Sequence, residues 1–414
     1  MAAGLLPMQS QAELGTRILK ERLELVLPWA MERSGIDCWI VAAKENCKDP
    51  ILKTLYPWDM PDVRRVGILV FQRNREDGTI RKMVIGPHSP AMESMYERVQ
   101  RPEESVWEAL SRVVGEHAPK KIAVNRSKAY GFCDGLTSTL DEQLREALGE
   151  DAAKLCDGEE LTIRWLQRVT PLEKEVLRTL VNVTHDLIYY SFSQQLITVG
   201  ETTTTEIEWF MRDVIKRLGF NYWFGPDVDL QRQGSPSSRM FNEVILPGDL
   251  LHCDVGINGH YVQLHTDMQL VAYVLKEGEQ EAPPELEDLL SKGNRLQDIV
   301  RDNISIYQTG NDALLNSIHA ARLEGINPMV YTHPLGTFGH GAGPHIGQYN
   351  KQEFLPGVGE RPIENLTCYA LELNVSEQVA SWANQLVFMY LEEVVCKDGT
   401  VDFLDGRQEK LIVI

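Results

Sequence analysis

The stretch LLHCDVGINGHYVQLHTD (residues 250–267) decides how the second half of this 414-residue chain folds. Apolar and polar residues alternate on both sides of Asn258-Gly259, a pattern typical of a β-hairpin. Two aspartates, Asp254 and Asp267, lie among apolar neighbours in this stretch. Because a buried carboxylate is costly by itself, we expect these two to be paired or to bind a cation.

The spacing of the two aspartates sets a condition on the hairpin. A two-residue turn at Asn258-Gly259 would pair Asp254 with Gln263 and leave Asp267 four residues further on, roughly 13 Å away along the strand. Carboxylates at that separation cannot share a metal ion. We therefore predict a bulge, or a wider loop, centred near His260 and Tyr261, because bulges are common beside active sites.

Composition narrows the class of protein. Hydrophobic residues make up 43% of the chain and charged residues 24%, as in a soluble globular protein long enough for two domains. The formal net charge of −19 argues against a nucleic-acid-binding surface. Seven scattered cysteines without a CxxC pair favour reduced thiols. We find no signal peptide and no membrane-spanning run, so we expect a cytoplasmic protein without a membrane partner.

The first part of the chain, residues 1–165, is expected to form an α/β domain because helical and strand patterns alternate along it. Helices are predicted over 10–34, 104–117 and 136–148, and strands over 38–42, 66–71, 82–85 and 121–124.

Residues 166–414 are expected to form an α+β domain, an antiparallel sheet backed by helices. Thr170-Pro171-Leu172-Glu173 predicts a helix start with a capping box, and the helix is expected to continue to about residue 199. A second helix is predicted to begin after the threonine run 202–205 and to end by Gly219. Later helices are predicted over 285–308, where Gly310 would close the helix, and over 312–323. Strands are expected from about 368 to 414, with turns at 398–399 and 405–406.

Three more segments carry residues that suit a metal site. His333 and His340 lie in YTHPLGTFGHGAGP (331–344), while Glu372 and Glu392 each lie in an apolar, strand-like run. Carboxylates can bridge two divalent ions, and imidazole suits Mn, Fe, Co and Zn. Two such ions can activate a shared water and stabilise the oxyanion that forms.

The order Asp, Asp, His, Glu, Glu resembles the M24 metallopeptidase family, which includes methionine aminopeptidase, Xaa-Pro aminopeptidase and prolidase and shares the pita-bread fold with creatinase. The resemblance extends over the whole chain and implies a creatinase-type N-terminal domain followed by a pita-bread catalytic domain. It implies two divalent ions (Mn, Co, Zn or Fe), a short peptide or small amide as substrate, and a homodimer.

The resemblance also implies a role for each residue of the set. Asp254 would bind one metal ion, Asp267 and Glu392 would bridge both, and His333 and Glu372 would bind the second. Glu372 would take a proton from a metal-bridging water, whose hydroxide attacks the substrate. His340 would face the substrate and steady the tetrahedral intermediate, and Tyr261 is predicted to line the substrate pocket. His340 also competes for the metal role, because its glycine-rich surroundings look like those of the metal-binding histidine in methionine aminopeptidases.

Several positions depart from the family pattern. The arginine often found just after the second aspartate is absent, since Met268, Gln269 and Leu270 stand there. The histidine expected upstream of Pro247-Gly248-Asp249 is missing as well. That histidine contacts substrate in the peptidases, so its absence bears on substrate class more than on metal binding.

These features favour a dinuclear aminopeptidase or dipeptidase that hydrolyses the N-terminal peptide bond of short peptides, with or without a preference for proline. One alternative is a creatinase-like hydrolase or lyase that acts on a small non-peptide metabolite, although creatinase lacks the full metal set. Another is a catalytically silent binding module, which would have no reason to keep five buried metal-binding groups.

Overall fold

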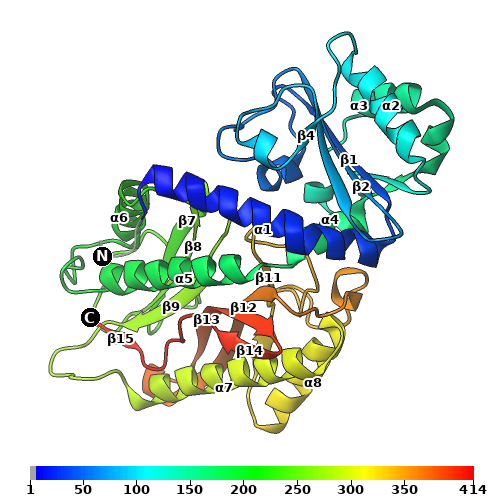
Figure 1. The fold of residues 1–414 in the computed structure, drawn as a ribbon. Coiled ribbons are helices and arrows are strands. Elements are labelled where there is room, and N and C mark those ends of the chain that lie inside the picture. The colour runs from blue at the N-terminus through cyan, green and yellow to red at the C-terminus, as the bar shows by residue number, and fades with distance from the viewer. Residues whose placement is uncertain (1–5) are drawn as a thin grey trace. The chain divides into compact units, whose positions relative to one another are not determined.

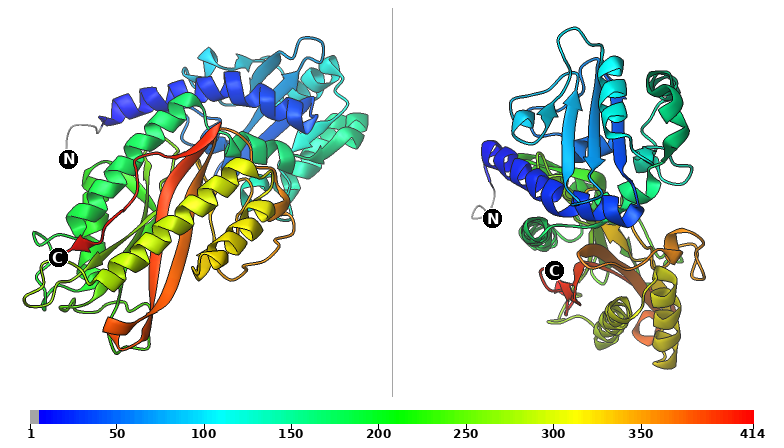
Figure 2. Two further views of the ribbon diagram at one scale, coloured as in Figure 1. Left: turned by 90° about the horizontal axis from the view of Figure 1, so that it is seen from below. Right: turned by 45° about the vertical axis from the view of Figure 1, so that its right-hand side comes forward.

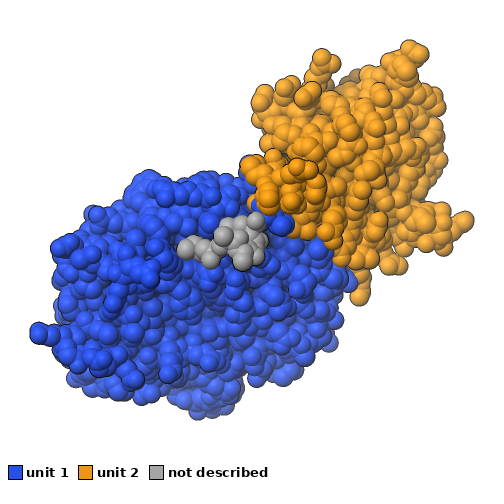
Figure 3. Space-filling model, turned by 60° about the vertical axis from the view of Figure 1, so that its left-hand side comes forward, with its two compact units in different colours: residues 1–6, 167–260, 264–414 blue, residues 7–166, 261–263 orange. Residues whose placement is uncertain are grey.

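The computed structural model describes residues 6–414, which divide into two compact units (Figures 1 and 3). The N-terminal unit comprises residues 7–166 together with 261–263, and the C-terminal unit comprises Leu6, 167–260 and 264–414. No helix among the described residues is long and apolar enough to cross a membrane.

The N-terminal unit is a six-stranded mixed sheet with helices packed against it. The strand order is β4-β3-β2-β1-β5-β6. The strands are β1 (Cys38–Lys44), β2 (Val66–Arg73), β3 (Ile80–Ile85), β4 (Glu97–Arg98), β5 (Ile122–Val124) and β6 (Leu155–Asp157). The helices are α1 (Met8–Ser34), α2 (Val106–His117), α3 (Ser138–Leu148) and α4 (Glu159–Gln167).

Alternation along β1 explains how this sheet is buried. Ile40 and Ala42 pack in one core with Leu110 of α2 and Leu144 of α3, and a capping box at Ser105 begins α2. The helices and strands predicted for this part of the chain are all present, within a few residues at each end. Strands β4 and β6 and helix α4 were not predicted.

The C-terminal unit is built on a nine-stranded sheet with four long helices. The main strand order is β10-β12-β13-β9-β8-β7, with β11 beside β12, β14 beside β13 and β15 beside β9. The strands are β7 (Phe220–Gln231), β8 (Leu250–Gly259), β9 (Met268–Tyr273), β10 (Pro328–Val330), β11 (His333–Leu335), β12 (Thr367–Val379), β13 (Gln385–Asp398), β14 (Thr400–Phe403) and β15 (Ile412–Val413). The helices are α5 (Pro171–Ser191), α6 (Thr204–Arg217), α7 (Pro284–Ile306) and α8 (Gly310–Leu323).

Helix boundaries follow local capping chemistry. The predicted capping box at Thr170 is confirmed: its side chain accepts from the Glu173 amide, and the Glu173 carboxylate accepts from the Thr170 amide. The prediction that α5 continues to about residue 199 is wrong, because the helix ends at Ser191. The Ser193 hydroxyl bonds to the Tyr190 carbonyl there, and serine competes with helical bonding in this way.

Gly310 was predicted to close a helix, and this is wrong. It is the first residue of α8, and the preceding Thr309 caps that helix through the Asp312 amide. A Cβ atom on Gly310 would lie 2.1 Å from the carbonyl oxygen of His345, so only glycine allows this approach.

The sheet of the C-terminal unit separates an apolar face from a polar one. Leu371 and Leu373 on β12 and Leu391 on β13 lie in one core with the leucines of α7, and Figure 2 shows α7 lying along these two strands. Successive side chains of a strand point to opposite faces. Glu372 and Glu392 therefore point away from α7, toward the site described next.

Candidate metal centre

The hairpin that carries the two aspartates is wider than a two-residue turn. Asp254 pairs with Gln269, and Asn258 forms a bridge with His265, so the register is continuous and the turn is centred between residues 261 and 262. The prediction of a bulge or a wider loop near His260 and Tyr261 is confirmed as a wider loop, and the return strand pairs with β8 without a register shift. The irregular register lies instead on β7, opposite residues 254–257 of β8.

Pairing with β7 explains why the chain does not turn at Asn258-Gly259. These two residues pair with Asn221 and Phe220 of β7, which holds them in an extended strand. The sequence analysis did not predict β7. As a result, Asp254 and Asp267 lie on the same face of neighbouring strands as diagonal neighbours, within reach of each other's side chains.

Four strands contribute one residue each to a single polar row. In register order these residues are Glu372 on β12, Glu392 on β13, Gln269 on β9 and Asp254 on β8. Asp267 precedes Gln269 by two positions and shares its face. Four carboxylates therefore converge on one polar face of the sheet: the three in this row and that of Asp267 beside it.

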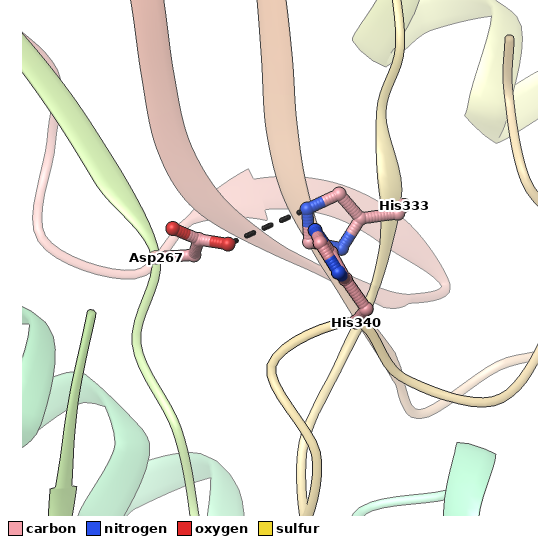
Figure 4. A group of neighbouring side chains, drawn as sticks. All are labelled: Asp267, His333 and His340. Atoms are coloured by element: carbon pink, nitrogen blue, oxygen red, sulfur yellow. Dashed lines mark ion pairs between the residues drawn. The ribbon is translucent and has the colours of Figure 1, made fainter. Parts of the chain in front are cut away.

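His333 completes the cluster from β11, where it lies opposite Ala370 of β12. Its Nε2 atom lies 3.4 Å from Asp267 Oδ2, along the dashed line of Figure 4. The same atom lies 3.7 Å from Glu372 Oε2 and 3.7 Å from Glu392 Oε1. Its Nδ1 atom lies 3.1 Å from the Pro334 carbonyl oxygen and donates to it, so the lone pair of Nε2 faces the carboxylates.

The protonation tendencies of the cluster follow from its burial. Burial, and for Asp254, Glu372 and Glu392 also repulsion from neighbouring carboxylates, raises the pKa of all four carboxyls well above its usual range. Burial lowers the pKa of His333 to about 4, so its imidazole is neutral at pH 7. Without a bound cation these groups would face one another as buried acceptors.

Unpartnered atoms mark the place for a cation. Among the described residues, Asp254 Oδ1, Glu392 Oε1 and His333 Nε2 are buried without a hydrogen-bond partner. Such atoms are costly unless something donates to them or binds them. A histidine that donates one ring N–H to a backbone carbonyl and turns the other nitrogen to carboxylates also has the arrangement of a metal ligand. The residues present therefore fit a divalent metal.

The predicted ligands form overlapping groups of three, in which one ligand atom per residue lies within 4.8 Å of the others. The groups are Asp254, Asp267 and Glu392; His333, Glu372 and Glu392; and Asp267, His333 and His340. The structure thus brings together all five predicted ligands and His340. The role of each residue stays a prediction.

His340 lies at the exposed side of the cluster. Its ring is 4.7 Å from that of His333 and 5.2 Å from that of Trp223, centroid to centroid, and Figure 4 shows it beside His333. Trp223 lies so close to Gly256 and Gly339 that a Cβ on either would come within 2.2 Å of its ring. Only glycine at these two positions allows the ring of Trp223 to pack this closely against the backbone beside the site.

Tyr261, predicted to line the substrate pocket, belongs to the N-terminal unit. Its ring centroid lies 6.5 Å from that of Trp58. Its role toward substrate stays a prediction.

The sequence analysis named Gln269 only as the place where an arginine was missing. The structure shows that it donates to Glu372 Oε1 at 2.6 Å and to Glu392 Oε2 at 2.9 Å. The signal for it was present in the sequence, because Gln269 follows Asp267 by two positions and so shares its face. His252 is also buried, and its Nε2 atom lies 3.0 Å from Gln269 Oε1.

Comparison with known proteins shows which solved structures share this fold. No protein-family model matches the chain, and no curated protein matches it in sequence. The X-Pro aminopeptidase of Thermotoga maritima superposes with a TM-score of 0.66 at 16% identity, over 92% of this chain and 99% of that one. The Xaa-Pro dipeptidase of Bacillus anthracis gives 0.61 at 14% identity, over 96% and 100%, and the prolidase of Pyrococcus furiosus gives 0.58 at 13%, over 92% and 100%.

The chain therefore has the fold shared by Xaa-Pro aminopeptidases and prolidases, over nearly its whole length. The fold implied by the sequence resemblance is confirmed at this level, as is the mixture of helices and strands. At these identities the likeness concerns the fold, so the activity has to be argued from the site.

Proposed function

We propose that this protein is a metal-dependent aminopeptidase or dipeptidase that hydrolyses the N-terminal peptide bond of short peptides. One observation supports the proposal above all: four carboxylates and the lone pair of His333 Nε2 converge in a buried cluster with unpartnered acceptor atoms. The shared fold adds support, because structures with this fold include proteins named as Xaa-Pro aminopeptidases and prolidases.

Five residues would hold two divalent ions, Mn, Co, Zn or Fe. Asp254 would bind one ion, His333 and Glu372 the other, and Asp267 and Glu392 both. When bound, the ions would activate a water molecule and polarise the scissile carbonyl.

The remaining steps belong to side chains of this chain. Glu372, whose pKa is raised by burial and by the neighbouring aspartates, would accept the proton of the attacking water and pass it to the leaving amine. It suits this task because its side chain is 19% exposed, whereas that of Glu392 is 1% exposed. His340, at the exposed side of the cluster, would donate to the developing oxyanion.

The test combines metal analysis with a peptide panel. We expect about two equivalents of Mn, Fe, Co or Zn in the purified protein, loss of activity on chelation, and cleavage of dipeptides or tripeptides. Peptides with and without proline in the second position would define the specificity. An Asp267→Ala variant controls for contaminating peptidases.

Two results would contradict the proposal. A protein that binds metal but cleaves no peptide, and instead converts a small amide or guanidino compound, would favour the creatinase-like alternative. A protein that binds no divalent metal would favour a non-catalytic module. The homodimer implied by the resemblance is a separate prediction, which light scattering of the purified protein tests.

A further inference from the structure

A buried line of hydrogen bonds leads to the candidate metal centre from the side of β7. Arg239 Nε donates to Asp229 Oδ2 at 2.8 Å, and His252 Nδ1 lies 2.9 Å from the same oxygen. His252 Nε2 lies 3.0 Å from Gln269 Oε1. Asp229, His252 and Gln269 are all buried. None of these four residues has a role in the proposed function.

The line ends on the two glutamates of the row. The Gln269 amide nitrogen donates to Glu372 Oε1 and to Glu392 Oε2. The other oxygen of each glutamate, Glu372 Oε2 and Glu392 Oε1, is the one that lies 3.7 Å from His333 Nε2. Gln269 therefore holds one oxygen of each carboxylate by a hydrogen bond, and the second oxygen of each carboxylate is directed at His333.

Only one orientation of the Gln269 amide satisfies its neighbours. The carboxylates can only accept when ionised, so the amide NH2 must face them, and the amide oxygen must face a donor. His252 Nε2 supplies that donor. Without that donor the amide oxygen would be buried with no hydrogen-bond partner, which costs free energy and weakens the preference of the amide for this orientation.

We propose that Gln269, oriented by His252, is a positioning residue that sets Glu372 and Glu392 for metal binding. This inference rests on the proposed function in taking the two glutamates as ligands. Residues that hydrogen-bond to metal ligands act in this way in other proteins, where their loss typically weakens metal binding by about 10- to 100-fold.

Two substitutions of the same histidine test the orientation. The amide nitrogen of glutamine can occupy the place of a histidine Nε2, and that of asparagine the place of Nδ1. His252→Gln therefore retains the donor toward Gln269, and His252→Asn retains only the donor toward Asp229. We expect His252→Gln to bind Mn²⁺ nearly as tightly as the wild type, and His252→Asn to bind it about 10- to 100-fold more weakly.

The readout is calorimetric titration of Mn²⁺, and then of Zn²⁺, into chelator-treated full-length protein without substrate. Gln269→Met removes the donor to both glutamates and should weaken binding as much as His252→Asn. The double variant should be no weaker than Gln269→Met alone, because the two residues act in one line.

His185 supplies a matched control. It is also a buried histidine between two acceptors, but its partners are Glu393, on the opposite face of β13, and Asp405. His185→Asn should leave the Mn²⁺ affinity unchanged.

Wild-type affinity in both His252→Asn and Gln269→Met would overturn the inference, as would an equal loss in His185→Asn. If His252→Asn fails to fold, Gln269→Met decides alone. A wild-type protein that binds neither ion would overturn the proposed function as well, so the two failures are distinguishable.

Discussion

Glu372 on β12 and Glu392 on β13 lie directly opposite each other in the antiparallel register, with both carboxylates on the polar face of the sheet. Like charges at opposite positions destabilise a sheet, and burial increases the cost. Gln269 donates to one oxygen of each, which offsets only part of that cost. This pair of carboxylates therefore lowers the stability of the metal-free protein.

Glu392→Gln should stabilise the metal-free protein. The substitution removes a group whose charged form is disfavoured: burial, and then repulsion from Asp267 and Glu372, raises the pKa of Glu392. We expect a gain of about 1 kcal/mol or more in the free energy of unfolding, or roughly 2–4 °C in Tm. Differential scanning calorimetry after chelation measures this, and a lower Tm than that of the wild type would contradict it. With Mn²⁺ present the wild type should have the higher Tm of the two proteins, because it gains the free energy of metal binding and the variant lacks one ligand.

Asp267→Ala should abolish turnover while the fold persists. The proposal places Asp267 between both ions, and its Oδ2 atom lies 3.4 Å from His333 Nε2, nearer than either glutamate oxygen. Loss of a metal ligand should lower turnover by more than the roughly 100-fold that is typical for loss of a residue hydrogen-bonded to a ligand. Steady-state kinetics on the best peptide of the panel measures the loss, and circular dichroism checks the fold. Activity within tenfold of the wild type would exclude this role.

His333 and His340 should behave differently when each is replaced by alanine. We expect His333→Ala to lose Mn²⁺ affinity, because its Nε2 lone pair is the nitrogen that faces three carboxylates. His340→Ala should keep the metal and lose about 10²- to 10³-fold in kcat, as on removal of a donor to an oxyanion. The opposite result would assign the metal to His340, which also lies within reach of Asp267 and His333.

His185 should make stability depend on pH. Burial acts to lower its pKa, but hydrogen bonds and charge from Glu393 and Asp405 outweigh burial and raise the pKa to about 9, against 6.5 ordinarily. A raised pKa means that the contribution to stability is complete below pH 6.5 and is lost as the pH rises through about 9. The difference in unfolding free energy between the wild type and His185→Gln should therefore shrink between pH 6.5 and pH 10. Urea titrations at both pH values measure it, and a constant difference would count against the charged pair.

Local sequence patterns determined most helices and strands of this protein and its candidate metal ligands. The Thr170–Glu173 capping box and the apolar periodicities define helices and strands, because they depend on residues a few positions apart. Asp254, Asp267, Glu372 and Glu392 could be named as candidates because each is an acidic residue in an apolar, strand-like setting. His333 was named through the resemblance to the metallopeptidase family.

Strand pairing in the tertiary structure decided where the hairpin turns and which residues meet at the site. Asn258-Gly259 has the composition of a tight turn, yet pairing with β7 extends the strand through it and moves the turn to residues 261–262. The polar row exists only because four strands, drawn from positions 250 to 398, meet in one register. The bonds from His252 through Gln269 to the glutamates likewise join residues up to 123 positions apart. Local sequence places Gln269 on the same face as Asp267 but does not specify its partners on the other strands, since the free energy that selects them comes from burying the whole sheet against its helices.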